Sequence, residues 1–229
     1  MSAEGLRVED LYVRISGARI IEGLSLTVGP GQIVGLAGRN GAGKTTTLRA
    51  ISGAAGRTSG RVELDGRRLA ARPELVAQAG VAHVPEGRGI FPDLTVDQNI
   101  RLGVVRKAGD PGVLRDSLDK AFPAVARLRE QRAGRLSGGE QQMVALYRGL
   151  VSRPRILMVD EMSLGLSPRA LSTAIEILAR VGREQGIGIL VVDQNSRMLF
   201  DHCDLVYVLR DGRAHVAENA DELASAYFT

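Results

Sequence analysis

The segment GRNGAGKT, from Gly38 to Thr45, carries the strongest structural signal in this chain. Its glycine spacing is that of a phosphate-binding loop, in which the backbone curls around an anion and a helix N-terminus adds positive potential. The apolar run IVGLAG before it, from Ile33 to Gly38, has the composition of a buried parallel strand. A glycine-rich turn that binds nothing is the alternative, but the match lies between a strand and a helix, which favours a phosphate site.

The side chains of this loop predict nucleotide chemistry. Lys44 is expected to reach the β- and γ-phosphates of a nucleotide, and the hydroxyl of Thr45 is expected to bind Mg²⁺. The predicted binding residues are Gly38, Arg39, Asn40, Gly41, Ala42, Gly43, Lys44 and Thr45.

A second apolar run, from Ile156 to Val159, is followed directly by Asp160 and Glu161. Ligands bind at the carboxyl ends of strands in open α/β sheets, so Asp160 is expected to hold Mg²⁺ there. An Asp-Glu pair alone is a weak signal, because solvated carboxylate pairs are common on surfaces. The position of this pair, directly after a buried strand, favours a functional role.

The segment LSGGEQQ, from Leu136 to Gln142, precedes that strand. Ser137 and the amides near Gly138 and Gly139 are predicted to lie at a helix start, where they can bind a phosphate. Helix capping is the alternative interpretation, because Ser137 followed by Glu140 three residues later fits a capping box. The two interpretations are compatible.

Other segments predict strands and helices around these motifs. The pattern predicts strands over 6–15, 24–28, 60–69, 80–85 and 187–193, and a hairpin over 204–218. It predicts helices from the phosphate loop to about Gly53, over 168–186, and within 94–150, with loops near 109–112 and 133–138. This succession is typical of a mostly parallel sheet covered by helices.

The three motifs, in this order, resemble those of the ATP-binding subunits of ABC transporters, and the resemblance covers essentially the whole chain. It implies an α/β P-loop NTPase fold: a mostly parallel sheet core with an antiparallel β subdomain and an inserted helical subdomain. It implies one ABC ATPase domain over 1–229, in which 1–93 and 151–229 form the nucleotide-binding core with the β subdomain. Residues 94–150 would form the helical subdomain that carries LSGGEQQ.

The resemblance also implies roles for individual residues. Thr46 would give a further phosphate contact, and Glu161 would polarise the water that attacks the γ-phosphate of ATP. The γ-phosphate held by an opposing subunit would be contacted by Ser137, Gly138, Gly139 and Glu140. The chain would therefore be an ATPase that works as a head-to-tail dimer, with an identical or a different second ATPase subunit.

Four positions depart from the superfamily at large, and three of them recur together in one subgroup. Glu86, in VPEGR, occupies the place of a glutamine that senses Mg²⁺ and touches the membrane domain, and it is assigned to the nucleotide and Mg²⁺ site on that ground. Gln194 occupies the place of a catalytic histidine that contacts the γ-phosphate, and Ser167 that of an aspartate. These departures together resemble the second ATPase subunit of branched-chain amino acid importers.

Further positions differ from that subgroup. Ile15 takes the place of an aromatic residue that stacks on adenine, so we expect weaker discrimination between ATP and GTP. Tyr12 lies three residues away, and strand alternation predicts it on the opposite face. Met162 replaces a proline, and Asp193 replaces a glutamate.

Composition limits the partners. The chain has 229 residues, a net charge of +4 and 3% aromatic residues without tryptophan, which argues against a reader of single-stranded nucleic acid. Its arginines are scattered, so we expect no nucleic-acid partner. No apolar run approaches the roughly 18 residues of a membrane-spanning helix, so a channel would come from other proteins. The one cysteine, Cys203, suits a reducing compartment.

We therefore expect an ATPase at the cytoplasmic face of the cell membrane that powers import through integral membrane permease subunits. An extracytoplasmic solute-binding protein would be an indirect partner, and the cargo would be branched-chain amino acids or related small polar solutes. The loop Glu86–Pro92 is the expected contact with the membrane domain, where Phe91 either anchors the contact or packs into the helical subdomain. The alternatives are the ATPase of an exporter or lipid-transport homodimer, a soluble non-transport ABC ATPase, and a nucleotide-binding regulator without turnover.

Overall fold

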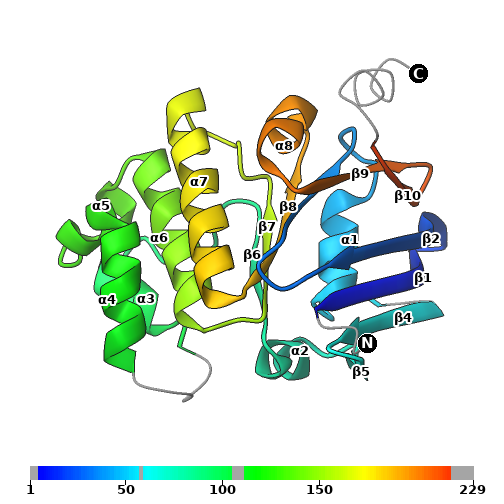
Figure 1. Ribbon diagram of the computed structural model, residues 1–229, viewed down its shortest axis with the longest axis horizontal. Helices are drawn as coiled ribbons and strands as arrows, with labels where there is room; N and C mark the ends of the chain where they lie inside the picture. The colour runs from blue at the N-terminus through cyan, green and yellow to red at the C-terminus, as the bar shows by residue number, and fades with distance from the viewer. Residues whose placement is uncertain (1–4, 57–58, 105–110, 218–229) are drawn as a thin grey trace.

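The computed structural model describes residues 5–56, 59–104 and 111–217 (Figure 1). The end of the hairpin predicted over 204–218 and part of the loop predicted near 109–112 lie outside these residues. Within them, the strands form a six-stranded sheet and a four-stranded sheet.

The six-stranded sheet has the order β10-β9-β3-β8-β7-β6. Strands β9, β3, β8, β7 and β6 run parallel to one another, and β10 pairs antiparallel with β9. Both faces of this sheet are covered by other elements, so its central strands are buried along their whole length. The strands are β3 (Ile33–Ala37), β6 (Val81–Val84), β7 (Ile156–Asp160), β8 (Gly188–Asp193), β9 (Leu205–Arg210) and β10 (Arg213–Val216). The predicted parallel core is confirmed.

The four-stranded sheet is antiparallel, in the order β2-β1-β4-β5. Its strands are β1 (Leu6–Ile15), β2 (Ala18–Val28), β4 (Ser59–Leu64) and β5 (Arg67–Arg68). The strand predicted over 24–28 is the end of the much longer β2. β1 and β2 meet at Ser16 and Gly17, which both have positive φ, and such two-residue turns match the twist of a hairpin.

The helices α3 to α6 gather at the end of the molecule opposite the four-stranded sheet (Figure 1). They are α3 (Val96–Arg101), α4 (Pro111–Ala121), α5 (Pro123–Arg127) and α6 (Gly138–Val151), with a short 3-10 turn, η1 (Ala133–Arg135), before α6. These elements occupy the stretch predicted to be helical. The other helices are α1 (Lys44–Ile51), α2 (Pro73–Ala79), α7 (Pro168–Gln185) and α8 (Ser196–His202).

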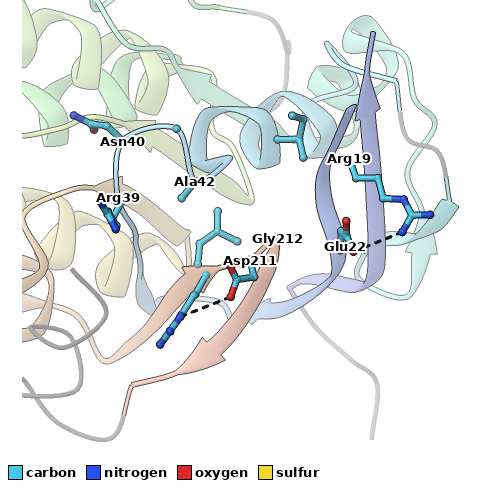
Figure 2. A pocket seen from close by; sticks show the side chains of 11 residues that line it. Arg19, Glu22, Arg39, Asn40, Ala42, Asp211 and Gly212 are labelled. Atoms are coloured by element: carbon cyan, nitrogen blue, oxygen red, sulfur yellow. Dashed lines mark ion pairs between the residues drawn. The ribbon is translucent and has the colours of Figure 1, made fainter. Parts of the chain in front are cut away.

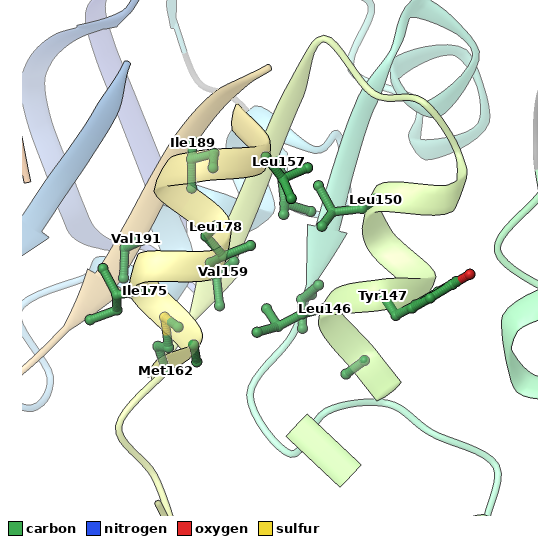
Figure 3. Close-up of a cluster of buried hydrophobic side chains, with 14 of the residues drawn as sticks. Leu146, Tyr147, Leu150, Leu157, Val159, Met162, Ile175, Leu178, Ile189 and Val191 are labelled. Atoms are coloured by element: carbon green, nitrogen blue, oxygen red, sulfur yellow. The ribbon is translucent and has the colours of Figure 1, made fainter. Parts of the chain in front are cut away.

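Two hydrophobic cores lie on the two faces of the large sheet. One contains Ile189 and Val191 of β8 together with side chains of α6 and α7 (Figure 3). The other contains Leu190 and Val192 of the same strand, together with side chains of the four-stranded sheet. Alternate residues of β8 therefore enter different cores, as the pleat of a strand requires.

Asp97 ties the helical elements together. Its carboxylate forms ion pairs with Arg101 over 2.7 Å, with Arg129 over 3.1 Å and with Arg115. Burial acts to raise the pKa of Asp97, but attraction to Arg115 and Arg101 outweighs it and lowers that pKa. In the part of the chain that the structure describes, no helix combines the length and apolar character needed to cross a membrane.

Candidate active site

The phosphate loop runs from the end of β3 to the start of α1, and its shape requires glycine. Gly43, directly before α1, has a φ of 104°, in the left-handed region that favours glycine. A Cβ atom at this position would also lie 2.8 Å from Cδ1 of Ile21 on β2. The close approach of β2 thus explains why only glycine fits here.

Lys44 is buried beneath the loop. Its Nζ donates hydrogen bonds to the carbonyls of Gly38 over 2.8 Å and Arg39 over 3.1 Å. Burial lowers the pKa of Lys44, while the carboxylates of Glu161, Asp193 and Asp160 act to raise it. The structure therefore brings the predicted lysine and both predicted acidic residues into one electrostatic cluster.

Asp160 ends β7, and it pairs in register with Val192 of the neighbouring strand β8. The residue is 2% exposed, and both carboxylate oxygens lack a hydrogen-bond partner. Burial raises the pKa of Asp160; the Thr45 hydroxyl acts to lower it and the charge of Glu86 to raise it. Because burial outweighs the Thr45 hydroxyl, the ionised form of this carboxylate would be stabilised by a bound cation.

Mg²⁺ fits this donor set. Within residues 5–56, 59–104 and 111–217, no cluster of three or more acidic, histidine or cysteine side chains forms a metal cage. Mg²⁺ is usually held by one or two carboxylates together with the phosphates of a substrate. Asp160 and the hydroxyl of Thr45 would supply the protein ligands, with Glu86 close enough to influence the charge of Asp160.

Glu161 follows Asp160 in a left-handed backbone conformation, with a φ of 44°. Its amide donates to the carbonyl of Val192 over 2.8 Å, which fixes the residue against the end of β8. Burial, followed by the negative charge of Glu86, raises the pKa of Glu161, and Lys44 opposes this shift. The carboxyl group of Glu161 therefore lies close enough to Glu86 and Lys44 for their charges to act on it.

The LSGGEQQ segment forms the capping box predicted for it. The Ser137 hydroxyl accepts from the amide of Glu140 over 3.3 Å, and the Glu140 carboxylate accepts from the Ser137 amide over 2.8 Å and its hydroxyl over 2.7 Å. These hydrogen bonds from Ser137 lower the pKa of Glu140. Phosphate binding at Ser137–Glu140 stays a prediction.

Three further predicted positions are exposed. Gln194 follows the end of β8 at the edge of the sheet that carries Asp160. Ile15 is 47% exposed and Tyr12 is 40% exposed, so these exposed fractions do not place the two side chains on opposite faces of β1. A register shift between Val13 and Arg14 interrupts strict alternation along β1.

A cavity of ≈ 680 Å³ lies beside the phosphate loop (Figure 2). It is lined by Arg39, Asn40, Gly41 and Ala42 of the loop, by Arg19, Ile20 and Glu22 of β2, and by Leu209, Arg210, Asp211 and Gly212 around the β9–β10 turn. Ile15 does not line this cavity; Arg19, Ile20 and Glu22 of β2 do, and the sequence patterns did not single them out.

Two sets of contacts in the site were not predicted. Asp193, fully buried at the end of β8, accepts hydrogen bonds from Ser163. Arg88, two residues after Glu86, donates to the side chain of Gln141 in α6 and to the carbonyl of Leu164. Each contact joins segments far apart in the chain, so no local pattern marks it.

A phosphate loop, a buried lysine and two carboxylates at the carboxyl edge of a parallel sheet define a P-loop ATPase cassette. Comparison with known families gives a match to the ABC transporter family over residues 21–163. The chain belongs to the ABC transporter family of ATP-binding proteins.

Individual relatives are similar over nearly the full chain. The high-affinity branched-chain amino acid transport ATP-binding protein BraG of Pseudomonas aeruginosa is 39% identical over 209 residues, which are 90% of this chain and 88% of BraG. The lipopolysaccharide export system ATP-binding protein LptB of Haemophilus influenzae is 32% identical, over 91% of this chain and 88% of LptB. A solved ATP-binding subunit of an ABC transporter superimposes with a TM-score of 0.82 at 26% identity, covering 98% of this chain and 93% of that chain. The protein is thus the ATPase subunit of a transporter.

Proposed function

We propose that this chain is the ATP-hydrolysing subunit that powers a membrane importer for branched-chain amino acids or related small polar solutes. The observation that carries the cargo class is the 39% identity to BraG over 90% of the chain. The departures at Glu86, Ser167 and Gln194 support the same subgroup.

Each residue of the site would have a separate role in ATP hydrolysis. The amides of the phosphate loop, Lys44 and the hydroxyls of Thr45 and Thr46 bind and orient the phosphates of ATP. Glu161 accepts a hydrogen bond from the attacking water and acts as general base or water-positioning group. Gln194 donates a hydrogen bond to the γ-phosphate. Mg²⁺, when held by Thr45 and Asp160, neutralises phosphate charge.

A second ATPase subunit would complete the site: in the family, the segment that LSGGEQQ resembles contacts the γ-phosphate held by an opposing subunit, and here it forms the capped start of α6. The segment Ser137–Glu140, in which Ser137 is exposed and the other three residues are half-buried, would face the γ-phosphate held by that partner in a head-to-tail dimer. The partners in the membrane would be integral permease subunits, with a solute-binding protein on the far side. The chain would work at the cytoplasmic face of the cell membrane.

The loop Glu86–Pro92 would contact the permease. The side chain of Phe91 is 51% exposed, so it is not buried in the helical subdomain and is available as an apolar anchor. Asn99, fully buried, accepts from the Phe91 amide over 2.8 Å and donates to the Phe91 carbonyl over 2.9 Å. The backbone beneath this exposed ring is therefore held rigidly.

A second candidate function is the ATPase of an exporter or lipid-transport homodimer. The observation that favours it is the 32% identity to LptB over 91% of the chain. The two functions differ in their partners, because an importer of this kind has two permease subunits and a solute-binding protein.

Co-purification from native membranes in mild detergent, followed by mass spectrometry, tests the proposal. Recovery of two integral membrane proteins and a second ATPase would support the importer, and the genes of those partners would indicate the cargo. Recovery of this chain as the single ATPase, with lipid-export components, would favour the second candidate. Recovery with soluble nucleic-acid factors would overturn both.

A further inference from the structure

Asp193 is a fully buried carboxylate at the carboxyl end of β8, and it lies between two loops of the site. One of its oxygens accepts hydrogen bonds from the Ser163 hydroxyl and the Asn195 amide, both over 2.8 Å. The other oxygen accepts from the Ser163 amide over 2.7 Å. The carboxylate therefore joins the loop after Glu161 to the loop that contains Gln194.

The backbone conformation of Glu161 is stabilised by a hydrogen bond to the end of β8. Its left-handed backbone, with a φ of 44°, is unfavourable for a residue with a side chain. The Glu161 amide is held by the carbonyl of Val192, and Ser163, two residues later, is held twice by Asp193. The end of β8 thus fixes both ends of the segment 161–163.

We infer that Asp193 is a positioning residue for Glu161, which it aims toward the phosphate loop by fixing Ser163 and Asn195. This inference rests on the proposed role of Glu161 in hydrolysis. Asp193 also acts by its charge on Lys44 and Glu161. The three hydrogen bonds that it accepts, however, all come from the two loops that it holds, and Ser163→Ala tests this route without changing the charge. Displacement of a reacting group by about 1 Å can slow a reaction roughly 100-fold. Loss of the Asp193 contacts should therefore lower turnover more than ATP binding.

The test compares kcat, KM for ATP and equilibrium ATP binding in the purified complex of the full-length chain with its second ATPase subunit. Asp193→Asn keeps the side-chain shape but leaves one acceptor oxygen in place of two. We expect it to lower kcat about 10- to 100-fold and to change the binding of ATP by less than about twofold. Ser163→Ala removes one of the three hydrogen bonds, and we expect a smaller decrease in kcat.

The double variant Asp193→Asn/Ser163→Ala shows whether the two residues act together. If Asp193 acts through Ser163, the double variant should have nearly the kcat of Asp193→Asn alone. Ser172→Ala is the matched control, because it removes a serine–carboxylate hydrogen bond of 2.9 Å, to Glu176, on the exposed face of α7. Its kcat should equal that of the wild type.

The inference is overturned if the two single variants keep the wild-type kcat, if their effects multiply in the double variant, or if ATP binding is lost in parallel with turnover. Melting temperatures of all variants show whether each is folded. If Asp193→Asn does not fold, Ser163→Ala still tests the inference.

Glu161→Gln separates this inference from the proposed function. If Glu161→Gln retains turnover, the assigned role of Glu161 fails. If Glu161→Gln is inactive while Ser163→Ala and Asp193→Asn are active, only the role of Asp193 fails.

Discussion

Arg88 and Gln141 are joined by a hydrogen bond of 2.9 Å, from Nη1 of the guanidinium to Oε1 of the amide. The second terminal nitrogen of Arg88 donates to the carbonyl of Leu164 over 3.3 Å. One side chain, from the loop after β6, therefore connects the start of α6 with the loop that follows Glu161. The proposed membrane-contact loop, the proposed partner-facing helix and the loop after the proposed catalytic residue Glu161 meet at Arg88.

Arg88→Ala should lower the basal kcat for ATP about tenfold. A hydrogen bond from a charged group contributes about 1.5–3 kcal/mol, and about 1.4 kcal/mol corresponds to a factor of ten in rate. Steady-state ATPase assays measure the change, with Arg197→Ala as the control because the Arg197 side chain is 90% exposed. Equal kcat values for the two variants would show that the Arg88 contacts do not support hydrolysis.

Phe91→Asp should abolish co-purification with the membrane subunits while basal ATPase survives. The exposed ring is available for an apolar contact, and a carboxylate at its position would have to be desolvated on binding. The buried amide of Asn99 bonds to the backbone of residue 91, so the loop should keep its shape. Leu102→Asp is the control, at a side chain that is 56% exposed on the end of α3. Intact assembly of Phe91→Asp would remove this residue from the contact.

Asp160→Asn should stabilise the protein without nucleotide and abolish Mg²⁺-dependent hydrolysis. Burial raises the pKa of Asp160 above 3.8, so the folded chain holds that proton more tightly than the unfolded chain does. The free energy of unfolding therefore falls as pH rises from 3.8 through the folded pKa, and the ionised carboxylate destabilises the fold at neutral pH. Thermal melting with and without MgATP measures both effects. A lower melting temperature for the variant, or an unchanged response to MgATP, would contradict this assignment.

The free energy of unfolding of the wild type should decrease on acidification, and His83 is the residue responsible. Burial, together with the charge of Arg49, lowers the pKa of His83 from 6.5 to about 4, and its Nε2 is buried without a hydrogen-bond partner. Between these pH values the unfolded chain binds a proton that the folded chain does not, so the free energy of unfolding falls as pH is lowered. From pH 7 to pH 5 the decrease should be about 2 kcal/mol.

Urea unfolding at these two pH values checks this expectation. His83→Gln should lose that part of the pH dependence, whereas His215→Gln, at an exposed position of β10, should keep it. An equal pH dependence in wild type and His83→Gln would show that His83 does not titrate in this way.

Ile15→Tyr should strengthen the preference for ATP over GTP. The wild type lacks the aromatic residue expected at this position, and stacking of a base on an aromatic ring is worth about 1–3 kcal/mol. Competition between the two nucleotides for the purified chain measures the ratio, with Val216→Tyr, at a side chain 49% exposed, as the control. A large ATP preference in the wild type itself would count against the assigned position.

Local signals account for most of the fold that the sequence predicts. The phosphate loop, β7 and β8 each carry an apolar run or a glycine pattern within a few residues, and all three lie where they were expected. The hairpin turn at Ser16 and Gly17 was missed, although a glycine after a small polar residue is a turn signal. The helix α8 was also missed; the cap at Asn195, whose side chain accepts from the Met198 amide over 3.1 Å, is the signal that marks its start.

The contacts that organise the site are not local. Ser163 and Asp193 are 30 residues apart and meet because β7 and β8 are neighbours in the sheet. Arg88 and Gln141 are 53 residues apart and meet because α6 packs beside β6. A single sequence contains no periodicity that specifies either pair, so they emerge only from the three-dimensional arrangement.

The alternation of β8 between two cores bears on how the protein unfolds. Ile189 and Val191 share a core with Val96 and Ile100 of the helical segment, while Leu190 and Val192 share the other core with the antiparallel sheet. Loss of packing in either core would expose one face of β8, whose other face belongs to the other core. The helical segment, although inserted, therefore lacks a core of its own and should not fold as an isolated fragment. Heating should melt the described part of the molecule in one cooperative transition.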